Sequence, residues 1–139
     1  MAVSFRILPQ HGLVHVRFSG QVILSDSSTA LQRFAAHPEF RPGLNQLIDL
    51  TDVTGHIADP VELFRVHARK AEVFNRPGEQ NLTVYIAPHE TAQKLVALIL
   101  RSFEGIEGLR HSVVRAEAEA MDVLGFAQRS VAELTEQPV

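Results

Sequence analysis

The chain has 139 residues, the size of one ordinary domain, with 45% hydrophobic residues, 21% charged residues and a formal net charge of -3. This charge supplies no positive field for a phosphate backbone, so nucleic acid is not expected as a ligand. There is no cysteine, which excludes disulfides, thiol nucleophiles and thiolate metal sites. The N-terminus lacks the apolar core of a signal peptide, and the longest aliphatic run, at 95–100, is too short to span a bilayer. We therefore expect one cytoplasmic domain over residues 1–139.

The N-terminal residues 3–20 predict a β-hairpin. Apolar and polar side chains alternate on both sides of the sequence PQHG, which supplies the residues of a turn. His15 lies on the polar face of the second strand. We therefore expect its side chain at the surface.

A short helix and a buried strand follow the hairpin. Residues 25–37 carry apolar side chains at helical spacing, with Ser25 or Asp26 as the N-cap. The prolines of HPEFRPG end this helix, because a residue before proline is pushed out of the helical region. The apolar sequence LNQLIDL at 44–50 predicts the third strand.

The rest of the chain alternates between helices and strands. Asp59 is the predicted N-cap of a helix that has Pro60 at its first position and Ala68 on its buried face. The later predicted elements are a strand at 81–87, a long helix at 88–105, a strand at 109–116 and a helix that stops at Gly125. The C-terminal extension, 126–139, is either another helical turn or a frayed end.

This order, β-β-α-β-α-β-α-β-α, predicts the fold class. Strands that alternate with helices form a largely parallel sheet through right-handed crossovers. Only the opening hairpin would be antiparallel. We therefore expect an α/β domain with a mixed five-stranded sheet, mostly parallel, with helices on its faces.

Together with the sequence LNQLIDLTDVTGHIAD, this order resembles the SpoIIAA-like superfamily, which includes the STAS domains of anti-sigma-factor antagonists and sulphate transporters. It is most similar to a bacterial STAS/SEC14-like group with a loop like HPEFRPG and a strand like LIDLTDVT. The resemblance covers nearly the whole chain by pattern. It implies a regulatory or protein-interaction module.

One feature of that family has no counterpart here. In regulatory STAS domains a serine at the junction between the third strand and the next helix is phosphorylated by a partner kinase. Between Asp49 and Leu63 this chain has no serine, and Ala58 and Asp59 stand near the expected place. Asp59 is either a helix cap worth about 1 kcal/mol or a mimic of the phosphorylated serine.

The carboxyl ends of parallel strands are where such sheets bind ligands, so the polar side chains at 49–59 are the candidate site. We expect Asp49 to bond backbone amides of the loop that follows it. His56 and His89 lack a tight metal-ligand spacing, and the sequence has no G-x-S-x-G elbow or P-loop. We therefore expect no catalytic residue, no metal and no cofactor. The candidates for interaction or switching are Thr51, Asp52, Thr54, His56 and Asp59.

The apolar helix at 89–104 supports a second hypothesis. Its leucine, valine and isoleucine side chains spread beyond one narrow stripe. Either it is a core helix covered by the C-terminal segment, or it borders an apolar pocket. The pocket candidates are Val96, Leu100 and Phe103.

The sequence thus predicts a non-enzymatic regulatory or protein-interaction module of STAS-like type without the usual phosphorylatable serine. A protein partner or self-association is expected. The alternative is a carrier of a small apolar molecule or lipid, in a pocket beside the 89–104 helix.

Overall fold

The structure, a computed structural model, describes residues 3–41, 43–57, 68, 81–102 and 109–135. Its helices and strands follow in the order β1 (Val3–Leu8), the 3-10 helix η1 (Pro9–His11), β2 (Leu13–Ile23), α1 (Leu24–Ala35), β3 (Asn45–Ile57), β4 (Asn81–Ile86), α3 (Glu90–Ser102), β5 (Leu109–Val114), α4 (Glu117–Leu124) and α5 (Val131–Thr135).

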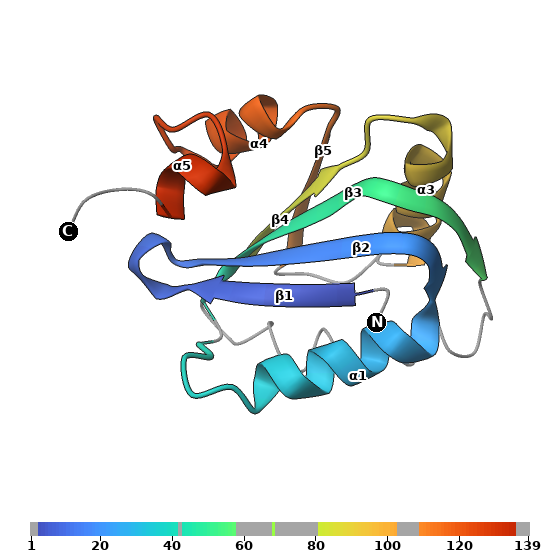
Figure 1. Cartoon of the computed structure of the whole chain (residues 1–139), viewed down its shortest axis with the longest axis horizontal. Coiled ribbons are helices and arrows are strands. Elements are labelled where there is room, and N and C mark those ends of the chain that lie inside the picture. The colour runs from blue at the N-terminus through green and yellow to red at the C-terminus, as the bar shows by residue number, and fades with distance from the viewer. Residues whose placement is uncertain (1–2, 42, 58–67, 69–80, 103–108, 136–139) are drawn as a thin grey trace.

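The strands form a five-stranded sheet in the order β1-β2-β3-β4-β5 (Figure 1). β1 is antiparallel to β2, and the other neighbouring pairs are parallel. The predicted mixed α/β fold is therefore confirmed. The hairpin turn is η1, and Gly12 closes it with a φ of 60°, a left-handed conformation that glycine adopts without strain.

Helices cover both faces of the sheet. Successive strand residues point to opposite sides, so each face has apolar side chains that a helix can bury. We call one side the α1/α3 face; there Tyr85 packs against α3, and Val14 packs against α1. The other is the α4/α5 face, where Leu47 and Val84 pack against both C-terminal helices. The core thus has two layers, one on each side of the sheet.

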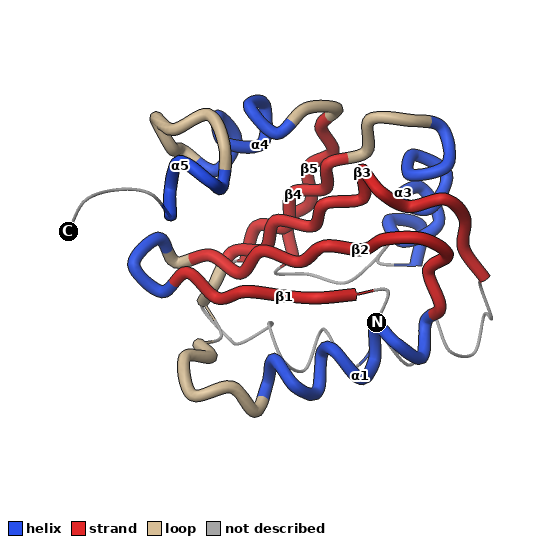
Figure 2. Tube along the Cα trace, viewed as in Figure 1, coloured by secondary structure: helices blue, strands red, loops and turns tan. Residues whose placement is uncertain are grey.

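β2 and β3 are longer than predicted. The strand expected at 44–50 continues to Ile57 and stays paired with β2, which runs to Ile23 (Figure 2). α1 then begins at Leu24 with Ile23 at its N-cap position, so the prediction that Ser25 or Asp26 caps it is wrong. Parallel backbone pairing, which a turn-rich sequence does not reveal, extends both strands.

Two predictions about the helices also need correction. The described part of the C-terminal segment does not cover α3, because α5 packs in the cluster of the α4/α5 face while α3 packs on the opposite face. Ala68 is helical as predicted, but it is exposed rather than buried. Asp59 and Pro60, with the predicted cap, lie outside the described residues.

For the C-terminal extension, the sequence left two alternatives, a further helical turn or a frayed end. Its described part forms α5, whose Val131 and Leu134 are buried against the sheet. Before it, α4 ends at Gly125 as predicted, with a φ of 85°. The extension is therefore a further helical turn that completes the core on this face.

Candidate functional site

The candidate residues lie on a two-stranded ribbon that continues β2 and β3. β4 pairs with β3 only from Gln46 to Asp49, whereas β2 pairs with β3 as far as Ile57. Two register shifts interrupt the β2–β3 ladder, beside Arg17/Ser19 and Gly20/Gln21. Such bulges twist a strand and re-aim its side chains.

Four predicted site residues therefore belong to a strand and not to a loop. Thr51, Asp52, Thr54 and His56 all lie within β3. The first three are exposed, and His56 is half-buried. At about 3.3 Å per residue they spread over more than 10 Å, so they form an extended surface rather than one converging site.

Arg17 connects β2 to two carboxylates of β3. Its Nη2 donates to Oδ2 of Asp52 at 3.1 Å, and its Nε lies 4.0 Å from Oδ2 of Asp49. The side chains of Arg17 and Asp52 are 57% and 56% exposed, so solvent weakens their attraction. The pair orients surface charges more than it stabilises the fold.

Asp49 fixes the backbone where the ladder shifts. Its Oδ1 accepts hydrogen bonds from the amide of Thr51 at 2.9 Å and from the Thr51 hydroxyl at 2.5 Å. This confirms the expectation that Asp49 bonds the following backbone, and the half-buried carboxylate is 14% exposed. Asp49 thus acts as a local clamp for the first candidate residue.

His89 also binds the backbone of Thr51. Its Nδ1 accepts from the amide of Ala92 at 3.2 Å, so its Nε2 carries the proton and donates to the carbonyl of Thr51 at 3.0 Å. His89 therefore caps the start of α3 and binds β3 just beyond the end of β4. The sequence did not predict either bond.

The outer part of the ribbon has fewer contacts. Thr54 is exposed beside the second register shift, and His56 is opposite Val22. Within the described residues, the buried Nδ1 of His56 has no hydrogen-bond partner. Asp59 lies outside the described residues, so its role as cap or phosphoserine mimic stays a prediction.

Sequence reasoning missed His15 as part of this polar region. His15 is half-buried on the α4/α5 face, two residues from Arg17 on β2. Burial lowers its pKa below the ordinary 6.5; the charges of Arg17 and Arg6 lower it too, while those of Asp49 and Glu117 oppose the change. No local signal marks it, because its carboxylate neighbours come from other elements.

The predicted pocket residues are part of the core where the structure describes them. Val96 is 2% exposed within the cluster that α3 forms with the sheet. Leu100 is half-buried against the same cluster, and Phe103 lies outside the described residues. These positions give the carrier hypothesis no support.

Within the described residues, no group of three or more histidine, aspartate or glutamate side chains is arranged to hold a metal ion. None of the helices in those ranges has the length and apolar character needed to cross a bilayer.

Comparison with known proteins identifies the fold. No protein-family model matches the sequence, and no curated protein matches it. A solved structure, that of the anti-sigma factor antagonist SpoIIAA in its unphosphorylated form, matches 90% of this chain and 100% of its own, with a TM-score of 0.51 and 12% sequence identity. At that identity the match shows the fold, and the predicted SpoIIAA-like fold is confirmed.

Proposed function

We propose that this protein is a protein-interaction module with a SpoIIAA-like fold and that its partner binds the ribbon of β2 and β3. The ribbon surface is defined by Asp52 and Thr54, and Arg17 lies beside it where β2 still pairs with β1; all three residues are exposed. SpoIIAA, by the name of its structure, antagonises an anti-sigma factor, which is a protein-binding role. A comparable role here is our inference.

The observation that carries the proposal is the double clamp on Thr51. Asp49 accepts its amide and hydroxyl, and His89 donates to its carbonyl. Both side chains hold a backbone that no β4 residue supports at this point. A strand fixed in this way presents the following exposed residues in one conformation, which lowers the entropy cost of binding a partner.

The same bonds argue against catalysis by Asp49. A general base must have an oxygen directed at a substrate proton. Oδ1 of Asp49 already accepts two hydrogen bonds from Thr51, and Oδ2 lies beside Arg17. The carboxylate is therefore used to shape the backbone, which supports a non-enzymatic role.

We further propose that binding is not controlled by phosphorylation at the usual family position. The sequence has Ala58 and Asp59 there instead of serine. A carboxylate has a permanent charge of about one, whereas a phosphoserine carries up to about two and can be removed. Phosphorylation at that position would then not switch partner binding on or off.

Site-directed photocrosslinking tests the proposal. A benzophenone amino acid at Thr54 is placed on the ribbon, and the same group at Ala132 is a control on α5, where it is also exposed. The tagged chain is irradiated in cells of its source, and crosslinked proteins are identified by mass spectrometry. We expect one partner to crosslink from Thr54 and not from Ala132.

A matched pair of charge reversals makes the result specific. Asp52→Lys changes the ribbon, and Glu119→Lys makes the same change of net charge at an exposed position on α4. Only Asp52→Lys should remove the crosslink. Equal crosslinking from Thr54 and Ala132, or full retention in Asp52→Lys, would contradict a partner site on the ribbon.

A further inference from the structure

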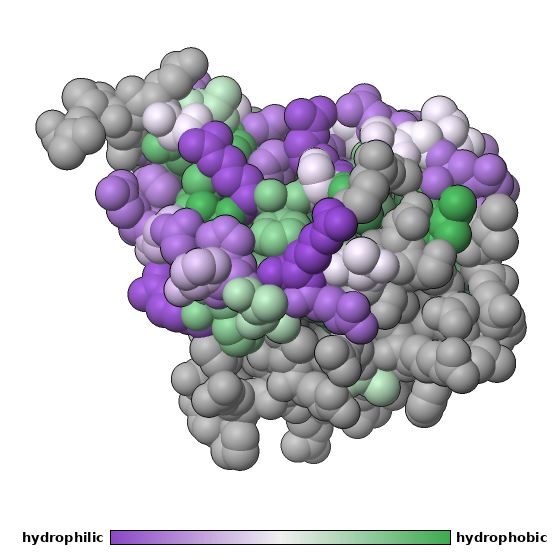
Figure 3. All heavy atoms as spheres, turned by 60° about the horizontal axis from the view of Figure 1, so that its bottom comes forward, coloured by the Kyte–Doolittle hydropathy of each residue, from purple (hydrophilic) through white to green (hydrophobic). Residues whose placement is uncertain are grey.

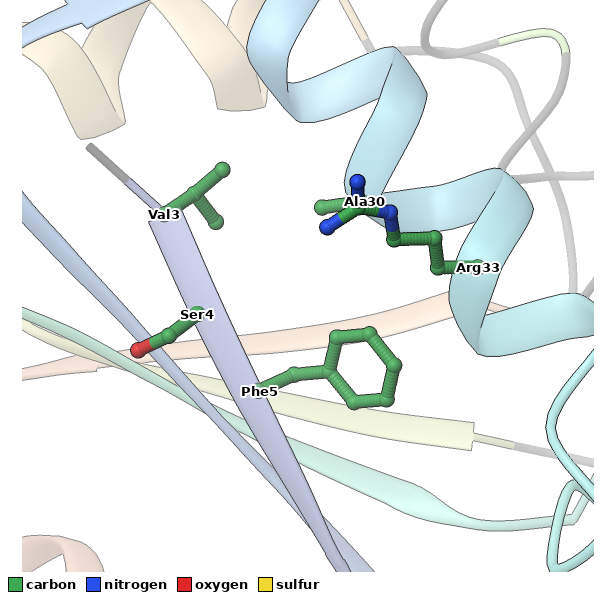
Figure 4. Close-up of a pocket in the computed structure, with 5 residues that line it drawn as sticks. All are labelled: Val3, Ser4, Phe5, Ala30 and Arg33. Atoms are coloured by element: carbon green, nitrogen blue, oxygen red, sulfur yellow. The ribbon is translucent and has the colours of Figure 1, made fainter. Parts of the chain in front are cut away.

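The sheet has two edge strands, β1 and β5, and they differ in what lies beside them. α1 lies along β1, and Val3 and Phe5 point toward it (Figure 4). The space between them is bordered by Val3 and Ala30, which are only 2% and 8% exposed, so it offers a ligand little surface. On the side of the molecule seen in Figure 3, the described residues are mostly hydrophilic, with small hydrophobic groups between them. β5, in contrast, has exposed apolar and charged side chains.

The main chain of Val113 on β5 points away from the sheet. The carbonyl of the next residue, Val114, accepts a hydrogen bond from the amide of Ala87, just after β4, at 2.8 Å. Because alternate residues of a strand direct their N–H and C=O groups to opposite edges, those of Val113 point outward. Within the described residues β5 pairs only with β4, so an added strand can bond both groups.

The side chains of β5 divide between the two faces of the sheet. Arg110 is in register with Leu82, which packs on the α4/α5 face, whereas Val113 is in register with Tyr85 of the α1/α3 face. Val113 is 44% exposed, and Arg110 is exposed as well. The edge thus presents a cation on one face and an apolar group on the other.

Two arginines lie at the ends of this edge. Arg110 is near the start of β5, and Arg115 directly follows its end; both are exposed. The ion pairs that join described residues involve neither of them. Glu117, the acid that follows Arg115 most closely in the chain, accepts through its Oε1 from the amide of Val131 at 2.7 Å. The two positive charges are therefore available to an acidic partner.

We infer that the β5 edge binds an extended acidic peptide segment of a partner, which adds a strand to the sheet and directs carboxylates at Arg110 and Arg115. Strand addition gives affinity through main-chain hydrogen bonds and specificity through alternate side chains. The strand from Arg110 to Val114 is about 13 Å long, which matches about five residues of the peptide. A second copy of the chain suits this edge less well, because it would bring further arginines beside those already there.

The probe is the acetylated and amidated pentapeptide Glu-Val-Thr-Val-Glu. Its sequence is the same in both directions, so the test does not assume the direction of the added strand. Centred on Ser112, the peptide places one glutamate beside Arg110 and the other near Arg115, and it places its valines on the face of Val113.

The peptide is titrated into the full chain labelled with ¹⁵N, and amide shifts are recorded. We expect the shifts to concentrate at 110–115. The amide proton of Val113 should move downfield and exchange more slowly with solvent, because it gains a hydrogen bond. The amide of Val114, which points to β4, should change less. The same peptide with every amide nitrogen methylated should not bind, because methylation removes the main-chain donors.

Matched variants test the charges. Arg110→Gln and Arg115→Gln should each weaken binding on the order of two- to fivefold, as expected for a solvent-exposed ion pair. The variant with both changes should bind the peptide and its analogue with two glutamines equally. Arg6→Gln, at an exposed position on β1 at the opposite edge of the sheet, is the control and should leave the affinity unchanged.

Other results would overturn the inference. Equal binding of the N-methylated peptide would exclude strand addition, and equal binding by all the arginine variants would exclude an acidic partner. A mass that doubles with concentration, together with shifts of the β5 amides without any peptide, would show that a second copy of the chain occupies the edge. Because none of these readouts involves Thr54 or Asp52, they do not depend on the ribbon proposal.

Discussion

His89 donates from its Nε2 to the carbonyl of Thr51 across 3.0 Å, and so joins the start of α3 to β3 one residue after Leu50. β4 pairs with β3 no further than Asp49. Pro88, which follows β4 closely, has no amide proton to donate to β3. The imidazole therefore takes the place of a strand neighbour at this point of the sheet. The same ring caps α3 through the amide of Ala92.

Removing this ring separates its two roles. We expect His89→Ala to lower the free energy of unfolding by about 1–2 kcal/mol, because one helix cap and one backbone contact are lost. His89→Asn should recover most of the capping contribution, since asparagine is a favoured N-cap, but not the bond to Thr51. Urea unfolding of both variants measures this difference. Equal losses in the two variants would show that the cap contributes nothing.

Asp49 and Asp52 offer a matched comparison of a clamp with a surface ion pair. Asp49→Ala should lower the free energy of unfolding by about 1–3 kcal/mol, because the Thr51 amide and hydroxyl lose their acceptor. Asp52→Ala should change it by less than about 1 kcal/mol, because its bond to Arg17 is solvent-exposed. Thermal unfolding of the two variants under the same conditions tests the order. A larger loss for Asp52→Ala would contradict the clamp.

His15 gives the folded chain a pH-dependent stability. Its pKa is lowered in the folded protein, mainly by burial, whereas in the unfolded chain it takes up a proton near the ordinary value of 6.5. Between these two values the unfolded state binds more protons, so this contribution is present above pH 6.5 and is lost as the pH falls.

The variant His15→Asn isolates that contribution. We expect the stability of the wild type relative to His15→Asn to decrease as the pH is lowered from about 7.5 to 5.5. Urea unfolding at several pH values measures the difference at each pH. A difference that stays constant or grows on acidification would show that the pKa of His15 is not lowered in the folded chain.

The core on the α4/α5 face predicts contrasting effects within one helix. Met121 on α4 is 0% exposed and contacts the sheet, whereas Val123 on the same helix is 41% exposed. Met121→Ala should cost about 2–5 kcal/mol through lost burial and a cavity, and Val123→Ala less than about 0.5 kcal/mol. Denaturant unfolding tests both variants, with the curves fitted to one common slope of free energy against denaturant concentration. Similar losses would mean that α4 does not pack against the sheet.

Asp59 supplies a prediction that comes from the sequence alone. If it caps the helix that Pro60 is predicted to begin, Asp59→Ala should cost about 1 kcal/mol of stability, and Asp59→Ser should cost less because serine is also a good N-cap. Thermal melts measure both, with the Thr54 crosslink as a parallel readout. Unchanged stability together with a lost crosslink in Asp59→Ala would instead identify Asp59 as a mimic of phosphoserine.

Much of the fold could be predicted because its signals are local. Alternation around PQHG predicted the hairpin, and the last predicted helix, with its end at Gly125, corresponds to α4. The order of strands and helices then restricts the sheet to a few topologies, because parallel crossovers have one hand. These features depend on the pattern of apolar and polar side chains, which can be read directly from the sequence.

The length of β3 and the contacts of the candidate site were decided only by the tertiary structure. The polar residues from Thr51 onward read as a loop, and they form a strand because β2 pairs with them as far as Ile57. Arg17 meets Asp49 and Asp52 only because that register sets β2 beside β3. Burial of His15 likewise depends on separate elements that fold over it. Sequence periodicity reports which face of a strand is apolar, but pairing between distant segments fixes where a strand ends and which charges become neighbours.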